Sequence, residues 1–221
     1  MTRFPGYDVL GQSGTWDRAT QGVVLARIGP QPALRFFTPA EQAVAAALFD
    51  LLLDLAADDP VVPVLEMVDA RLAELQTDGW RYHDMPPDDQ AWQRSLAGLD
   101  LDARSRGTAG GFAELPRTQQ AGRIQAVQDL GPRLWYGLSA AHVWSLWTRY
   151  ACTAYYSHPQ AWSEIGFGGP AYPRGYLRIG VDAREPWEVA DQEPEQEPDR
   201  EPDREPEQEP EQDPVPKGGH Q

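Results

Sequence analysis

The chain has 221 residues, with 34 Asp and Glu against 19 Lys and Arg, and a formal net charge of −15 at pH 7. Phosphate backbones repel so acidic a chain, and no stretch is rich in Lys and Arg, so nucleic acid is not an expected partner. No apolar run reaches the roughly 18 residues of a membrane span. The N-terminus has neither an apolar signal segment nor paired arginines. We therefore expect a cytoplasmic protein, while export together with a partner stays open.

The first 37 residues show no clear helical pattern, and we expect an irregular N-terminal segment over 1–37. Within it, Val23–Ile28 is interpreted as a short strand or an extended stretch. The first clear helix start is the sequence TPAE at Thr38–Glu41. Threonine is a good N-cap, proline suits the first helical position, and Glu41 completes a capping box. The nearly all-apolar sequence that follows predicts a helix buried over most of its surface.

Three further helices are predicted between residues 63 and 130. The first begins near Pro63 and is expected to end at Gly79, the second begins at Asp88 or Asp89, and the third follows Pro116. Their apolar residues recur at steps of three and four, which is the helical period. These residues are Val64, Leu65, Val68, Leu72 and Leu75, then Trp92, Leu96 and Leu99, then Ile124 and Val127. Phe112 and Leu115, in the preceding loop, are expected to enter the core.

A fifth helix is predicted from just after Pro132 to Tyr156. Its expected buried stripe comprises Leu138, Ala141, Ser145, Cys152 and Tyr156. Cys152 is the single cysteine, so no intramolecular disulfide can form, and its apolar surroundings suggest a small buried side chain. The fold class is thus mostly α, with about five helices, an irregular N-terminal segment and a long C-terminal arm rich in Gly, Pro and aromatic residues. We place the helical domain at 38–190 and its aromatic arm at 155–180.

The last 31 residues have a different composition. From Glu193 the chain repeats Glu-Pro-Glu-Gln and Glu-Pro-Asp-Arg without an aliphatic or aromatic side chain. Residues 191–221 hold twelve acidic and three basic residues, a net charge of −9, which leaves −6 for residues 1–190. Proline at this spacing removes backbone donors, and the like charges repel one another. The sequence predicts a disordered acidic tail at 191–221.

The arm is the most distinctive part of the chain. Tyr155–Tyr176 reads YYSHPQAWSEIGFGGPAYPRGY and holds six aromatic rings, four glycines and three prolines. Aromatic residues and arginine are enriched at interface hot spots, so the arm suits docking against another protein. Wrapping around the chain's own helices is the other interpretation, and one segment can do both. The expected partner-binding residues are Tyr155, Tyr156, His158, Trp162, Glu164, Phe167, Gly169, Pro170, Tyr172, Arg174 and Tyr176.

Signals for catalysis or cofactor binding are weak. The four histidines form no HExxH motif, and one cysteine cannot make a CxxC pair, so no metal site is expected. In GFGGP, Pro170 and later Pro173 follow the glycines, which leaves no helix N-terminus to hold a phosphate. We expect a buried ion pair between Glu164 and Arg174 that fixes the arm. Two alternatives stay open: a small stand-alone enzyme using His158, Glu164 and Arg174, and a helical scaffold whose acidic tail recruits partners.

Three segments carry a resemblance to a known family. HPQAWSEIGFGGPAYPRGY, residues 158–176, resembles the closing motif of the gluconate 2-dehydrogenase subunit 3 family, which has the form W-x-x-[IV]-G-[FWY]-x-G-P. The places of that motif are filled by Trp162, Ile165, Gly166, Phe167, Gly169 and Pro170. FFTPAE at 36–41 resembles the family's opening helix, and GFAEL at 111–115 its middle element. The resemblance spans roughly residues 34–180.

This resemblance implies a non-catalytic small subunit of an oxidoreductase complex. Members of the family accompany a large FAD-dependent flavoprotein of the glucose–methanol–choline type, in some complexes with a cytochrome subunit as well. The expected role is to bind the large subunit and to stabilise or mature it. FAD is expected in that partner, and no cofactor is expected in this chain. Many members carry a twin-arginine signal, which this N-terminus lacks.

Overall fold

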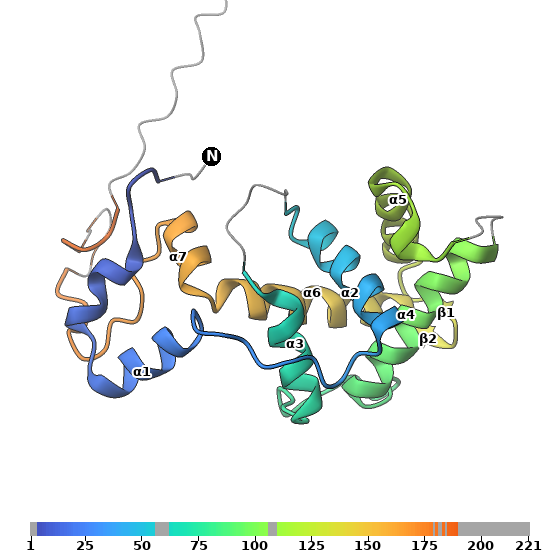
Figure 1. Cartoon of the computed structure of the whole chain (residues 1–221), viewed down its shortest axis with the longest axis horizontal. Helices are drawn as coiled ribbons and strands as arrows, with labels where there is room; N and C mark the ends of the chain where they lie inside the picture. The colour runs from blue at the N-terminus through green and yellow to red at the C-terminus, as the bar shows by residue number, and fades with distance from the viewer. Residues whose placement is uncertain are drawn as a thin grey trace, which may run out of the picture. The chain divides into compact units, whose positions relative to one another are not determined.

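The computed structural model describes residues 4–55, 62–105, 110–178, 180, 183 and 185–189. The chain divides into a compact unit, residues 1–189, and a second unit, residues 190–221. The predicted acidic tail therefore lies outside the described residues. The compact unit is mostly helical, as the sequence predicts (Figure 1).

The described ranges contain seven α-helices, two short 3-10 helices (η) and one two-stranded hairpin. In chain order they are η1 (Val9–Thr15), α1 (Arg18–Ala26), α2 (Pro39–Leu52), α3 (Val64–Ala73), α4 (Asp88–Ser105), η2 (Phe112–Glu114), α5 (Arg117–Asp129), β1 (Leu134–Trp135), β2 (Leu138–Ser139), α6 (Ala140–Tyr156) and α7 (Pro159–Ile165). The strands of the hairpin are antiparallel, with Trp135 opposite Leu138.

Residues 9–15 and 18–26 are helical, so the prediction of irregular structure over 1–37 is wrong there, whereas residues 30–37 have no regular secondary structure. Asp17 caps α1, because its Oδ1 accepts a hydrogen bond from the Thr20 amide at 2.8 Å. Asp8 caps η1 in the same way through the Leu10 amide. Val23 consequently lies in a helix and not in a strand. Asp8 and Asp17 were the sequence signal for these two helices, because aspartate is a preferred N-cap residue.

Helix α2 follows the prediction closely. The Thr38 hydroxyl accepts from the Glu41 amide, and the Glu41 carboxylate accepts from the Thr38 amide, so both halves of the capping box are present. Helix α3 starts as expected but ends at Ala73, well before Gly79. There Leu75 adopts a left-handed conformation with φ 52°, and the Gln76 amide donates to the Arg71 carbonyl at 2.9 Å. That pairing is a Schellman ending, here built without a glycine.

Helix α6 begins at Ala140 because the hairpin occupies the preceding residues. Tyr136 and Gly137 form its turn with φ values of 47° and 75°, the left-handed pair that two-residue hairpins require. The buried face of α6 is therefore not the predicted stripe. It comprises Ala140, Val143, Leu146, Trp147, Tyr150, Ala151, Ala154 and Tyr155. Cys152 is exposed, which corrects the expectation of a buried thiol.

The described residues bury two hydrophobic clusters. The main core lies among α2 to α6, with Trp92, Trp147, Tyr150, Phe49 and Phe112 as its largest fully buried side chains. Phe112 and Leu115 enter it, as predicted. The second core comprises Val9, Trp16, Val24 and Trp162. It joins η1 and α1 to α7, which lie beside one another in Figure 1.

A buried carboxylate ties the segment before α2 to the main core. Asp69 of α3 is 1% exposed, and its oxygens accept the backbone amides of Arg35, Phe36 and Phe37 at 2.6, 2.9 and 2.8 Å. A carboxylate buried without partners is costly, whereas three amide donors satisfy most of its acceptor capacity. Asp69 thus fixes where the chain enters α2.

Candidate functional site

The arm is more ordered than its composition predicts. After α6 ends, His158 caps α7 by accepting from the Gln160 amide, and Pro159 occupies the first helical position. Proline suits that position because the amide it lacks would have no partner there. The expectation that Pro159 opens an irregular segment is therefore wrong. Gly166 ends α7 in a left-handed conformation with φ 73°, the usual role of a glycine at a helix C-terminus.

The glycines of GFGGP allow close packing inside the molecule. A Cβ at Gly169 would lie 2.7 Å from a ring carbon of Trp16, and one at Gly166 would lie 2.7 Å from the Phe4 ring. A Cβ at Gly168 would lie 2.9 Å from the Trp187 ring. No residue with a side chain fits these contacts without displacement. The closing motif is thus covered on this side by the chain's own N-terminal and C-terminal segments.

Of the eleven residues predicted to contact a partner, nine divide into an inner and an outer set, while Glu164 and Arg174 are partly exposed. Tyr155, His158 and Trp162 are buried, as are Gly169 and, more partly, Pro170. The Trp162 indole donates to the Tyr156 carbonyl at 2.6 Å and packs in the second core. The outer set is exposed and comprises Tyr156, Phe167, Tyr172 and Tyr176. The arm therefore wraps the chain and still presents four rings to solvent.

The three residues of the stand-alone enzyme hypothesis have separate partners. The His158 ring lies 3.1 Å from the Arg27 carbonyl, and burial lowers its pKa. The Glu164 carboxylate accepts from the Tyr155 hydroxyl at 2.6 Å. Arg174 donates to the Gly168 carbonyl at 2.8 Å, and its guanidinium lies 4.1 Å from the centre of the Trp187 ring. Among the described residues the expected Glu164–Arg174 ion pair is not formed, so that prediction is wrong.

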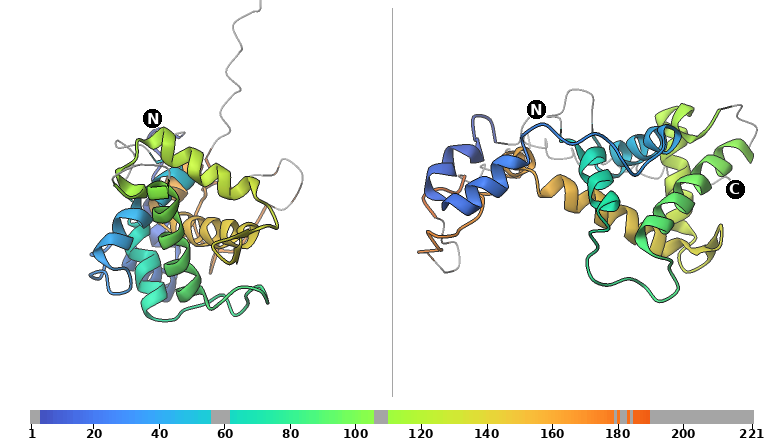
Figure 2. Two further views of the ribbon diagram at one scale, coloured as in Figure 1. Left: turned by 90° about the vertical axis from the view of Figure 1, so that its right-hand side faces the viewer. Right: turned by 60° about the horizontal axis from the view of Figure 1, so that its bottom comes forward.

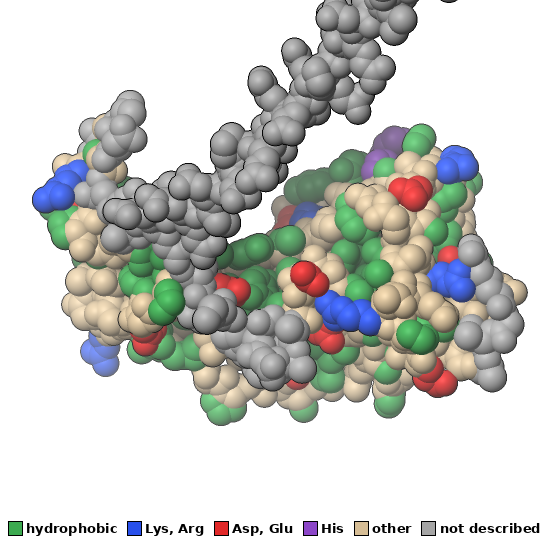
Figure 3. Space-filling view, turned by 90° about the horizontal axis from the view of Figure 1, so that it is seen from above, with side chains coloured by type: hydrophobic (Ala, Val, Ile, Leu, Met, Phe, Trp, Pro, Cys, Tyr) green, Lys and Arg blue, Asp and Glu red, His purple; other side chains and the backbone are tan. Residues whose placement is uncertain are grey.

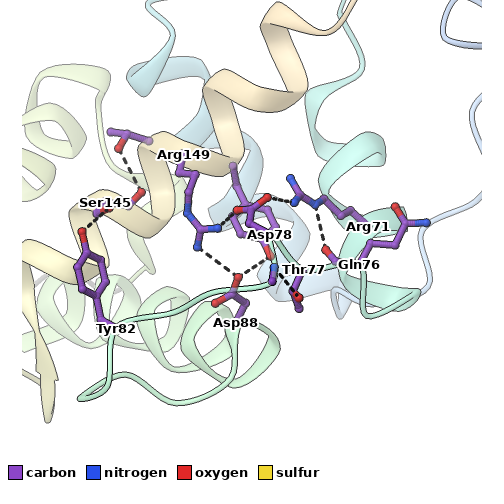
Figure 4. A network of polar contacts seen from close by, with 11 residues as sticks. Arg71, Gln76, Thr77, Asp78, Tyr82, Asp88, Ser145 and Arg149 are labelled. Carbon is purple, nitrogen blue, oxygen red and sulfur yellow. Dashed lines mark hydrogen bonds and ion pairs between the residues drawn. The ribbon is translucent and has the colours of Figure 1, made fainter.

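A second polar site, which the sequence did not indicate, lies between α3, α4 and α6 (Figure 4). Asp78 pairs with both Arg71 of α3 and Arg149 of α6. Arg149 also contacts the Asp88 carboxylate at 3.2 Å, and the Tyr150 hydroxyl donates to the same carboxylate at 2.8 Å. The network therefore joins α3, α4 and α6 to the α3–α4 loop (residues 74–87), which Figure 2 shows extending from the helices. Asp88 lies in the first turn of α4, where the sequence predicted the start of a helix, and its carboxylate takes part in this network.

Aromatic rings enclose the arginines of this network. The Arg149 guanidinium carbon lies 4.9 Å from the Trp80 ring centre and 5.1 Å from that of Tyr150, while Arg71 lies 4.8 Å from Tyr150. Burial lowers the pKa of Arg149, and burial together with the hydrogen bond to Asp88 raises the pKa of Tyr150. The rings thus shield the ion pairs from water, which strengthens them.

The α3–α4 loop has a second attachment to α6. The rings of Tyr82 and His142 stack in parallel with their centres 3.7 Å apart, and His142 Nδ1 lies 2.8 Å from the Asp84 carboxylate. His142 is thus hydrogen-bonded and partly buried. Beside the loop is a cavity of about 400 Å³, whose walls include Leu72, Leu75, Trp80 and Tyr150.

Neither site has the features of a metal centre or a nucleic-acid interface. Within the described ranges, no three His, Cys, Asp or Glu side chains converge as metal ligands. On the face drawn in Figure 3, basic and acidic side chains are scattered among hydrophobic and neutral atoms without forming a patch. None of the described helices combines the length and the apolar character needed to traverse a bilayer.

The fold and these sites define a small helical protein whose most distinctive elements are a glycine-dependent aromatic arm and a partly buried arginine–aspartate network. The family model described as gluconate 2-dehydrogenase subunit 3 matches residues 39–169. The chain therefore belongs to the gluconate 2-dehydrogenase subunit 3 family, which confirms the resemblance noted in its sequence. No curated protein and no solved structure matches the chain.

Proposed function

We propose that this protein is a non-catalytic subunit that binds an FAD-dependent large subunit of the glucose–methanol–choline type and stabilises or matures it. Family membership supports the association with a dehydrogenase complex. The observation that carries the proposal is the arm's outer set, since Tyr156, Phe167, Tyr172 and Tyr176 are each at least 41% exposed on a segment held by buried residues. Rings held in place lose little entropy when a partner covers them.

The proposed contact is made by the outer set, and the inner set supports it. Tyr155, Trp162 and Gly169 hold the arm against α6, η1 and α1, so their substitution would disturb the fold before it disturbed binding. The FAD of the proposed complex is held by the large subunit. The role of this chain is to cover and order a surface of that subunit.

Co-expression tests the proposal. An FAD-dependent large subunit of the glucose–methanol–choline type from the same organism is produced with and without this chain, and soluble yield, FAD content and dehydrogenase activity are compared. We expect all three to fall when the chain is absent. A large subunit that is equally soluble, loaded and active alone would refute the proposal.

Two substitutions then locate the contact. Tyr172→Ala and Tyr176→Ala remove exposed rings, and each is expected to cost on the order of 2 kcal/mol in association, the threshold of an interface hot spot. Leu134→Ala is the matched control, because Leu134 is 72% exposed but lies in the hairpin. Equal affinity for all three variants, each with unchanged thermal unfolding, would place the contact elsewhere.

A further inference from the structure

A cavity lies where α1 meets the closing motif of the arm. Its volume is about 380 Å³, and its walls are Ala19, Thr20, Val23, Val24 and Arg27 from α1 together with Trp162 and Pro170 from the motif. Trp162 lies within the family match and Pro170 directly follows its end at residue 169, whereas all of α1 precedes its start at residue 39. The family segment alone therefore provides only one wall of the cavity.

The walls are suited to an apolar side chain. Arg27 is the single charged residue lining the cavity, and it is already engaged, because it donates to the Ser157 carbonyl at 2.6 Å and lies 5.7 Å from the Trp162 ring centre. Val23 is 59% exposed at the mouth of the cavity, although it sits on a helix that packs on the second core. Pockets of this kind hold the anchor side chains that dominate protein interfaces.

The charge around the cavity specifies the partner further. Helix α1 and its two caps hold Arg18, Arg27 and one acidic residue, Asp17, whose carboxylate is used to cap the start of the helix. Arg18, in the first turn of α1, is exposed and has neither a hydrogen bond nor an ion pair within the part of the chain that the structure describes. A complementary surface would therefore bring a carboxylate to Arg18.

We propose that α1 and the closing motif together form a docking pocket for the large subunit, which inserts an apolar side chain and places a carboxylate against Arg18. The inference rests on the proposed function and adds to it that a helix outside the family segment contributes half of the pocket. The outer rings of the arm then extend the contact beyond the pocket.

The experiment uses the full chain and the same FAD-dependent large subunit as the co-expression test, with affinity measured by titration calorimetry. Val23→Asp places a carboxylate in the pocket and is expected to weaken binding at least tenfold. Leu25→Asp is the matched control, because Leu25 is exposed on the same helix but does not line the cavity, and it is expected to change affinity less than threefold. Arg18→Glu is expected to weaken binding and to reduce its dependence on salt.

A photo-crosslinker keeps the test valid if Val23→Asp disturbs α1. Benzoylphenylalanine at position 23 is expected to crosslink to the large subunit, and at position 25 to do so far less. If the unaltered chain binds while Val23→Asp binds equally well, or if both positions crosslink equally, the docking pocket is refuted and the proposed function stands. If the unaltered chain does not bind the large subunit, both are refuted.

Discussion

Gly169→Ala would show whether the closing motif needs glycine for packing or only for its backbone conformation. Gly169 has φ 74°, and a Cβ added there would lie 2.7 Å from Trp16 Cζ2 and 3.1 Å from Val9 Cγ2. A left-handed conformation costs a residue with a Cβ roughly 1–2 kcal/mol. Overpacking of a well-packed core adds about 1–3 kcal/mol. The expected total is about 2–5 kcal/mol of unfolding free energy.

Gly175→Ala separates the two contributions. Gly175 lies in the same arm with φ 71°, but nothing lies within 4 Å of the Cβ position. It should therefore show only the backbone cost of about 1–2 kcal/mol. Urea denaturation measures the difference, and hydrogen exchange of the amides in α1 should report faster opening for Gly169→Ala alone. Equal costs for the two variants would refute the argument from packing against Trp16.

Three further predictions concern the polar contacts. Arg149→Ala leaves Asp78 and Asp88 without one partner each and should lower the free energy of unfolding, measured by urea denaturation, by about 3 kcal/mol. Arg35→Ala is the control: its pair with Glu74 is half exposed, and its loss should cost under about 1 kcal/mol. Similar losses for the two variants would show that burial does not strengthen the network. Asp69→Ala should cost on the order of 3 kcal/mol and speed exchange of the amides of residues 35–37, and unchanged exchange would count against its anchoring role. Burial lowers the pKa of His158 in the folded state below its ordinary value of 6.5, so the free energy of unfolding should fall as the pH drops below 6.5. His158→Asn keeps an acceptor that can cap α7 and should flatten this pH dependence. An identical pH profile for the variant would exclude His158 as its source.

Helices with strong local signals were predictable from the sequence. The capping box at Thr38–Glu41 fixes the start of α2 through contacts within one helical turn, and Pro116 marks the start of α5. In each of these cases the deciding interactions lie within a few residues of one another, so the sequence contains them directly.

Long-range contacts were not predictable in the same way. The buried face of α6 is set by the helices that pack against it, α2 to α5 and α7, and this packing leaves Cys152 on the outside. The Asp78 network joins residues about seventy positions apart along the chain, and no local pattern marks them as partners. Glu164 is an example: the sequence predicted Arg174 as its partner, whereas in the structure it accepts a hydrogen bond from Tyr155, nine residues earlier in the chain.

The packing of Trp16 and Val9 on Gly169 has a practical consequence for dissecting this molecule. A fragment cut at the limits of the family match, 39–169, would lose η1 and α1 and expose the indole of Trp162. Such a fragment should aggregate or bind hydrophobic dyes, although every matched residue is present. The family match and the folding unit therefore end at different residues, and a fragment made for expression should include η1 and α1.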